Sequence, residues 1–114
     1  MKLETVWAGD IIEASGVMAL GDPLEFIKNC VANRRVYWTY HVNMRMRERF
    51  IARSMISGSV NSYKIIESYP EDKYLPSYLV RAESGGTVFH VLFAVDETNS
   101  NVRVITAYSP DKNQ

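Results

Sequence analysis

Residues 87–95 constrain the fold of this chain more than any other segment, because they are apolar on both faces that an extended strand would present. The two alternating sets are Val88, His90, Leu92 and Ala94 on one face, and Phe89, Val91, Phe93 and Val95 on the other. Such a strand belongs at the centre of a sheet with both faces covered. Helices can cover one of these faces, so the amino-terminal segment, a curl of the strands or a second copy must shield the other. We therefore expect a homo-oligomer.

Strand patterns separated by turn residues occupy the second half of the chain: residues 63–69, 77–83, 87–95 and 102–108. The connections between them are short and rich in residues that favour turns. Short connections join neighbouring strands as successive hairpins, so we expect a four-stranded antiparallel meander.

Helical patterns come before these strands. Asp22 followed by Pro23 predicts a helix start, since Asp caps a helix and Pro suits its first turn. Residues 36–39 are aromatic and β-branched and are expected to be extended. A second helix should then end near Phe50. The sequence is also compatible with a third short helix before the first strand.

The order of helices first and sheet second predicts an α+β fold, with two or three N-terminal helices packed on a four-stranded antiparallel meander sheet. At 114 residues the chain is long enough for one domain with a modest core. Residues 1–21 form a separate N-terminal lead segment, and residues 22–114 form the single α+β domain.

Composition excludes several classes of protein. The lone cysteine, Cys30, cannot form an internal disulfide, and its apolar helical neighbours predict burial rather than nucleophilic use. Two histidines without cysteine partners make a poor metal set, so no metal or cofactor is expected. No apolar run is long enough to cross a bilayer, and no signal peptide is recognised. A cytoplasmic protein without membrane contact fits these observations.

Positive charge is concentrated in one part of the chain although the formal net charge is zero. Residues 34–53 hold six arginines against one acid, Glu48, which gives this stretch a charge of +5. An anionic partner would find a basic surface there. The alternative is a basic helix face that is simply solvated.

His41, Arg45 and Arg49 are spaced four residues apart within this basic stretch. On a helix such residues drift by only about 40° per step, so they would form one cationic ridge. Arginines can grip phosphate oxygens, and histidine can transfer a proton near neutral pH. The ridge is therefore a candidate site for a phosphate or a carboxylate.

Two motifs carry a resemblance to a known family: His-x-x-x-Arg-Met-x-Glu-Arg from His41 to Arg49, and Ile-Thr-x-Tyr-x-Pro from Ile105 to Pro110. Together with the Asp22-Pro23 start, they resemble domain of unknown function family 4258, from about residue 22 to residue 111. That family has no established activity. Its helices-then-sheet plan is similar to that of RelE-type toxins, which cut RNA without a metal and are paired with an antitoxin.

The resemblance implies a set of site residues. The helix motif contributes His41, Arg45, Glu48 and Arg49, and the last strand contributes Tyr108. Metal-independent RNA cleavage needs a base, an acid and fixed positive charge, and these residue types suit those roles. His90 is a further possible site residue, although its apolar neighbours favour a core histidine.

Two functions remain open at this point. The first is an enzyme, a metal-independent endoribonuclease toxin that binds RNA and is held inactive by an antitoxin-like protein. The second is a non-catalytic interaction module that uses the basic helix face or a sheet edge. A scaffold role for the ridge, with Arg45 and Arg49 bridged to Glu67, Asp72 or Glu83, also stays open.

Overall fold

The computed structural model describes residues 22–110 of the chain. The predicted lead segment, residues 1–21, lies outside the described residues, as do residues 111–114 at the other end of the predicted domain. Within residues 22–110, no helix combines the length and the apolar character that crossing a membrane requires.

The first described helix, α2 (Pro23–Ala32), begins where the sequence predicts it. The Asp22 Oδ1 atom accepts hydrogen bonds from the backbone amides of Leu24 and Glu25, at 3.1 and 3.2 Å. These bonds satisfy two of the donors that a helix leaves unpaired in its first turn. Cys30 lies on the inner side of this helix, where burial raises the pKa of its thiol to about 11. Its predicted place in the core is confirmed.

The second helix, α3 (Tyr40–Glu48), carries the cationic ridge. Thr39 caps it, because the Thr39 hydroxyl oxygen accepts a hydrogen bond from the Val42 amide at 3.0 Å. Phe50 has a φ of 58°, a left-handed conformation that an α-helix cannot continue through, so the predicted end near Phe50 is confirmed. Two short segments complete the helical part, α4 (Arg53–Gly58) and the 3-10 helix η1 (Val60–Ser62).

Five strands form one sheet: β1 (Val36–Trp38), β2 (Lys64–Tyr69), β3 (Ser77–Ser84), β4 (Thr87–Asp96) and β5 (Asn101–Tyr108). Their spatial order is β1-β5-β4-β3-β2. The antiparallel meander predicted from the sequence is β2 to β5, and the doubly apolar strand β4 is central as expected. The α+β class is therefore confirmed.

The prediction of four antiparallel strands is wrong in one respect. Strand β1 is a fifth strand, and it pairs parallel with β5. Its three residues are too few to show an alternating pattern, and its partner is far along the chain. The sequence therefore indicated only an extended segment there. The pairing supplies partners to one side of β5, where the Val102 amide donates to the Arg35 carbonyl at 3.0 Å.

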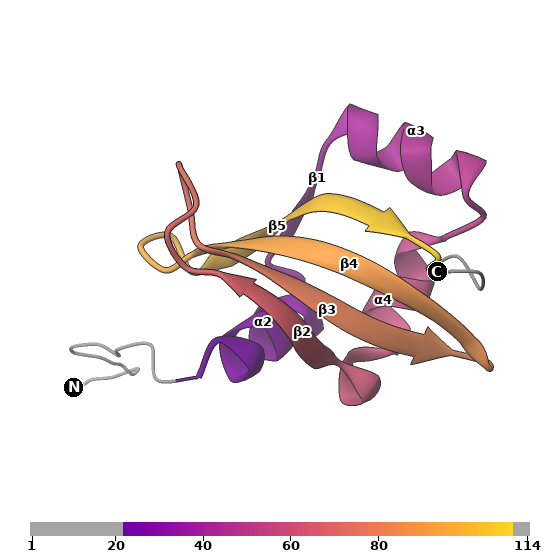
Figure 1. The fold of residues 1–114 in the computed structure, drawn as a ribbon, viewed down its shortest axis with the longest axis horizontal. Coiled ribbons are helices and arrows are strands. Elements are labelled where there is room, and N and C mark those ends of the chain that lie inside the picture. Colours follow the sequence, from indigo (N-terminus) through magenta and orange to yellow (C-terminus); the bar gives the residue numbers. More distant parts are fainter. Residues whose placement is uncertain (1–21, 111–114) are drawn as a thin grey trace.

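The helices cover one face of the sheet and one of its edges (Figure 1). Helix α2 contacts β4 and β5, and α4 contacts β3, whereas α3 lies beside β5 at the edge of the sheet. The side of β4 that bears Phe89 and Phe93 is buried beneath these helices, and we call it the inner face. The outer face carries His90 and Leu92 and is partly open.

Candidate functional site

The ridge predicted from the sequence lines a real groove. His41, Arg45 and Arg49 on α3 face Arg103, Ile105 and Thr106 on β5 across a cavity of about 440 Å³. We call this cavity the α3–β5 groove. In the described part of the chain, no acidic residue lines it. The helical spacing of the three ridge residues therefore does place them on one wall, as predicted.

Helix α3 is held against β5 by Arg49. The Arg49 Nη1 atom donates to the Ala107 carbonyl at 2.9 Å, with the Thr106 hydroxyl at 3.4 Å. Strand β1 pairs β5 only from Val102 to Val104, so Arg49 contacts the part of the edge that β1 leaves uncovered. A guanidinium has five N–H donors, and within residues 22–110 Arg49 uses only those of one nitrogen.

The other two ridge residues are solvent-exposed. Among residues 22–110, neither His41 nor Arg45 has a side-chain hydrogen bond or an ion pair. The salt bridges to Glu67, Asp72 or Glu83 that a scaffold role required are not formed, so that form of the scaffold alternative is wrong. A guanidinium without an acidic partner can bind an external anion without first breaking a bond.

Arg103 contributes less positive charge to the groove than its type suggests. Its Nη2 atom donates to Asp96 Oδ2 at 3.0 Å. Hydrogen bonds from Asn99, together with Arg103, hold the pKa of the Asp96 carboxyl below its usual value. Arg103 is thus committed to the β4–β5 turn, although it is also one of the residues that line the groove.

Glu48 does not join the ridge residues in the groove. Its side chain is exposed, it does not line the cavity, and among residues 22–110 it makes no ion pair with Arg45. The structure therefore gives it no contact with the site that the helix motif implied.

Tyr108 and His90 lie together on the outer face of the sheet. They are opposite each other on β5 and β4, with ring centroids 5.4 Å apart in an edge-to-face arrangement. Arg81 is the neighbour of His90 on β3. Burial and then Arg81 lower the pKa of His90, while Glu67 acts in the opposite direction. Within residues 22–110 the buried Nδ1 atom of His90 has no hydrogen-bond partner.

The predicted site residues thus fall into two neighbouring groups. His41, Arg45 and Arg49 line the groove, whereas His90 and Tyr108 share the outer face. Thr106 connects the groups, since it lines the groove and lies on the same face of β5 as Tyr108, about 7 Å along the strand.

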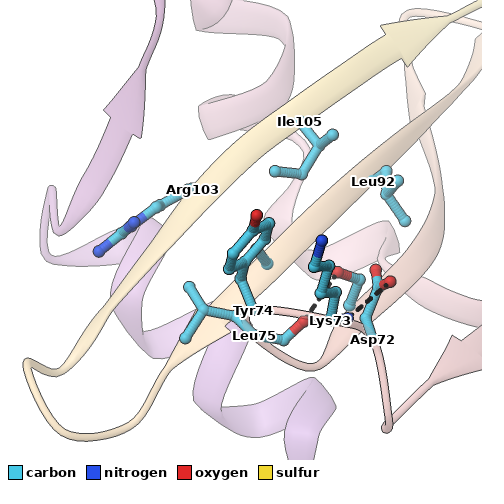
Figure 2. Close-up of a pocket in the computed structure, with 9 residues that line it drawn as sticks. Asp72, Lys73, Tyr74, Leu75, Leu92, Arg103 and Ile105 are labelled. Carbon is cyan, nitrogen blue, oxygen red and sulfur yellow. Dashed lines mark hydrogen bonds between the residues drawn. The ribbon is translucent and has the colours of Figure 1, made fainter.

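A second cavity, of about 370 Å³, lies on the outer face (Figure 2). Its walls come from the β2–β3 connection and from the sheet: Lys73, Tyr74, Leu75, Leu92, Arg103 and Ile105. We call it the Tyr74 pocket. Sequence reasoning missed it, because residues 70–76 read only as a polar turn. The one available signal was an aromatic residue, Tyr74, within that turn.

No cation-binding cluster is evident in the described part of the chain. Among residues 22–110, no three His, Cys, Asp or Glu side chains gather so that they could hold a metal ion.

Comparison with known proteins identifies one family. A family model with the description Domain of unknown function (DUF4258) matches residues 38–109, from the end of β1 to just beyond β5. The match includes the α3–β5 groove and the Tyr74 pocket but not α2, so it is shorter than the resemblance read from the sequence. Neither the search of curated proteins nor the search of solved structures found a significant match.

Proposed function

Because the chain belongs to domain of unknown function family 4258, whose description states no activity, we propose a function from the site itself: the α3–β5 groove binds phosphate groups of RNA. One observation carries the proposal. His41, Arg45 and Arg49 line one wall of a cavity that no acidic residue lines among residues 22–110. Phosphate contacts by arginine supply much of the affinity of nucleic-acid-binding proteins.

The same groove supports metal-independent cleavage as the proposed reaction. Attack of a ribose 2′-hydroxyl on the adjacent phosphate needs a base, and its leaving oxygen needs an acid. His41 is the groove residue suited to proton transfer, while Arg45 and Arg49 would stabilise the negative charge that develops on the phosphate. In this step His41 takes the proton of the 2′-hydroxyl, and Tyr108, on the adjoining outer face, is the proposed acid that gives its phenolic proton to the leaving oxygen.

The proposed biological setting is a toxin–antitoxin pair in the cytoplasm. The helix-then-meander order of α3 and β2 to β5 supports a RelE-type plan. In this setting an antitoxin-like protein would cover the groove, and the chain expressed alone would harm the cell. A homo-oligomer that leaves the groove and the Tyr74 pocket open remains part of the proposal.

A direct experiment separates RNA binding from cleavage. The purified chain is incubated with mixed RNA in EDTA, alongside Arg45→Ala, His41→Ala and Arg47→Ala. Arg47 is the matched control, because it is an exposed arginine of α3 that does not line the groove. We expect Arg45→Ala to weaken binding roughly 5- to 10-fold. We expect His41→Ala to keep binding but lose cleavage by roughly 100-fold or more.

Two outcomes would change the proposal. If the parent, Arg45→Ala and Arg47→Ala bind RNA equally, the groove is not the RNA-binding site. If RNA binding depends on Arg45 but no RNA is cleaved, the protein is an RNA-binding domain and the ribonuclease proposal is wrong.

A non-catalytic interaction module is the second candidate, and exposed aromatic residues favour it. Tyr40 is 77% exposed and Phe50 is 90% exposed, at the two ends of α3. Aromatic residues beside arginines are enriched in protein interfaces. Strand β2 is also an edge strand, to which a partner could add a strand. This candidate predicts capture of an acidic protein that Phe50→Ala weakens, without RNA turnover.

A further inference from the structure

The Tyr74 pocket has the dimensions and the chemistry of a small-ligand site. Its volume of about 370 Å³ falls within the range of roughly 300–1,000 Å³ typical of ligand pockets. Leu92 and Ile105 give it an apolar floor on the outer face of the sheet, and Leu75 adds an apolar wall. Lys73 and Asp72 bring polar groups to the same cavity, as Figure 2 shows.

Tyr74 is the feature that points to a planar ligand. Its side chain is 85% exposed, although it belongs to a pocket wall. The Lys73 Nζ atom lies over one face of the Tyr74 ring, 5.3 Å from its centre, so a ligand would stack on the opposite face. Exposed aromatic rings among cationic side chains are the features on which proteins stack unpaired bases.

The Tyr74 pocket and the α3–β5 groove are contiguous. Arg103 and Ile105 line both cavities, so one row of β5 side chains separates them. The Arg103 guanidinium is at the same time bonded to Asp96. A ligand with a phosphate in the groove would therefore have its next chemical group beside the pocket.

We propose that the Tyr74 pocket takes an unpaired nucleobase of the RNA whose phosphate lies in the α3–β5 groove. This inference rests on the proposed function and adds its substrate class, single-stranded RNA. A nucleobase has flat apolar faces for Tyr74 and the Leu92–Ile105 floor, and a polar edge for Lys73 and Asp72. In a duplex the bases are stacked and paired, so a duplex would offer phosphates to the groove but no base to the pocket.

The test compares ligands that differ only in their bases. The full chain is titrated with a 2′-O-methyl single-stranded oligonucleotide, which cannot be cleaved, and with a base-free oligomer of the same length and sugar. The variants are Tyr74→Ala, Arg45→Ala and the matched control Tyr37→Ala. Tyr37 is also an exposed tyrosine, at 59%, but it does not line the pocket or the groove.

We expect Tyr74→Ala to weaken binding of the oligonucleotide roughly 5- to 100-fold and to leave binding of the base-free oligomer unchanged. Arg45→Ala should weaken binding of both ligands, and Tyr37→Ala should affect neither. A duplex should bind the parent and the Tyr74→Ala variant equally.

The outcomes distinguish this inference from the proposed function. If Arg45→Ala weakens both ligands while Tyr74→Ala weakens neither, the groove binds RNA and the pocket proposal is overturned. An equal loss of both ligands in Tyr74→Ala would assign Tyr74 to backbone contact and also overturn it. If the parent binds neither ligand, the proposed function fails as well. Dimerisation that Tyr74→Ala abolishes, with unchanged RNA binding, would assign the pocket to a second copy.

Discussion

The two faces of β4 differ although their residues alternate along one strand. On the inner face Phe89, Val91, Phe93 and Val95 are each at most 1% exposed. On the outer face His90 and Leu92 are only partly buried, and the Tyr74 pocket opens beside Leu92. The doubly apolar pattern therefore produced a filled layer on one side and a ligand-sized cavity on the other.

This difference teaches that apolar character alone did not determine burial in this strand. The helices α2 and α4 cover the inner face, whereas the short β2–β3 connection reaches only part of the outer face. Substitutions at odd-numbered and even-numbered positions of β4 should therefore separate folding from ligand binding.

The largest effect is expected from Phe93→Ala. Phe93 is fully buried and packs against Tyr63, with ring centroids 5.8 Å apart. Its removal leaves a cavity in the inner layer and should lower the free energy of unfolding by about 3–5 kcal/mol. The matched outer-face change, Leu92→Ala, should cost about 1 kcal/mol, because Leu92 is partly exposed. Chemical denaturation measures both, and equal losses would contradict the comparison.

An intermediate effect is expected at the edge of the sheet. Arg49→Ala removes the bond to the Ala107 carbonyl and should lower the free energy of unfolding by about 1–2 kcal/mol. Arg45→Ala, one turn away, removes no bond to residues 22–110 and should stay within about 0.5 kcal/mol of the parent. Both should weaken RNA binding. Equal stability of the two variants would show that Arg49 does not hold α3 against β5.

Local signals were sufficient for most of the fold. The Asp22-Pro23 start follows from capping chemistry, and the meander follows from short connections. The left-handed backbone at Phe50, after the end of α3, is seen only in the structure. Strand β1 did not follow, because three residues carry no period and its pairing with β5 depends on the whole sheet. Local patterns also did not reveal that residues 70–76 would wall a pocket.

The candidate site was predictable only within α3. Helical geometry placed His41, Arg45 and Arg49 on one line, and they do line one groove. The same reasoning placed Glu48 near that line, yet Glu48 does not line the groove. Tertiary packing decides which side of the ridge faces β5, and helical spacing does not specify it. His90 lies beside Tyr108 and Arg81 because of the register of β3, β4 and β5. The helix motif and the strand motif do not specify this register.

The smallest expected effect is a pH dependence of stability that arises from His90. The charged or titratable groups facing it are Arg81 on β3, Tyr108 on β5 and Glu67 on β2. The pKa of His90 is lower in the folded protein than the ordinary value of 6.5, so near that pH the unfolded chain binds more protons. The free energy of unfolding should then fall as pH drops below about 6.5. His90→Gln should reduce this fall, measured by denaturation between about pH 5.5 and 8.

Two variants with opposite signs test whether the outer-face neighbours cause this dependence. Arg81→Gln removes a positive charge that lowers the pKa of His90, so the loss of stability on acidification should become smaller. Glu67→Gln removes a charge that raises the same pKa, so the loss should become larger. If both variants changed the dependence in the same direction, charge at the outer face would not control His90. The outer face would then influence His90 through burial alone, and in that respect it would resemble the inner face.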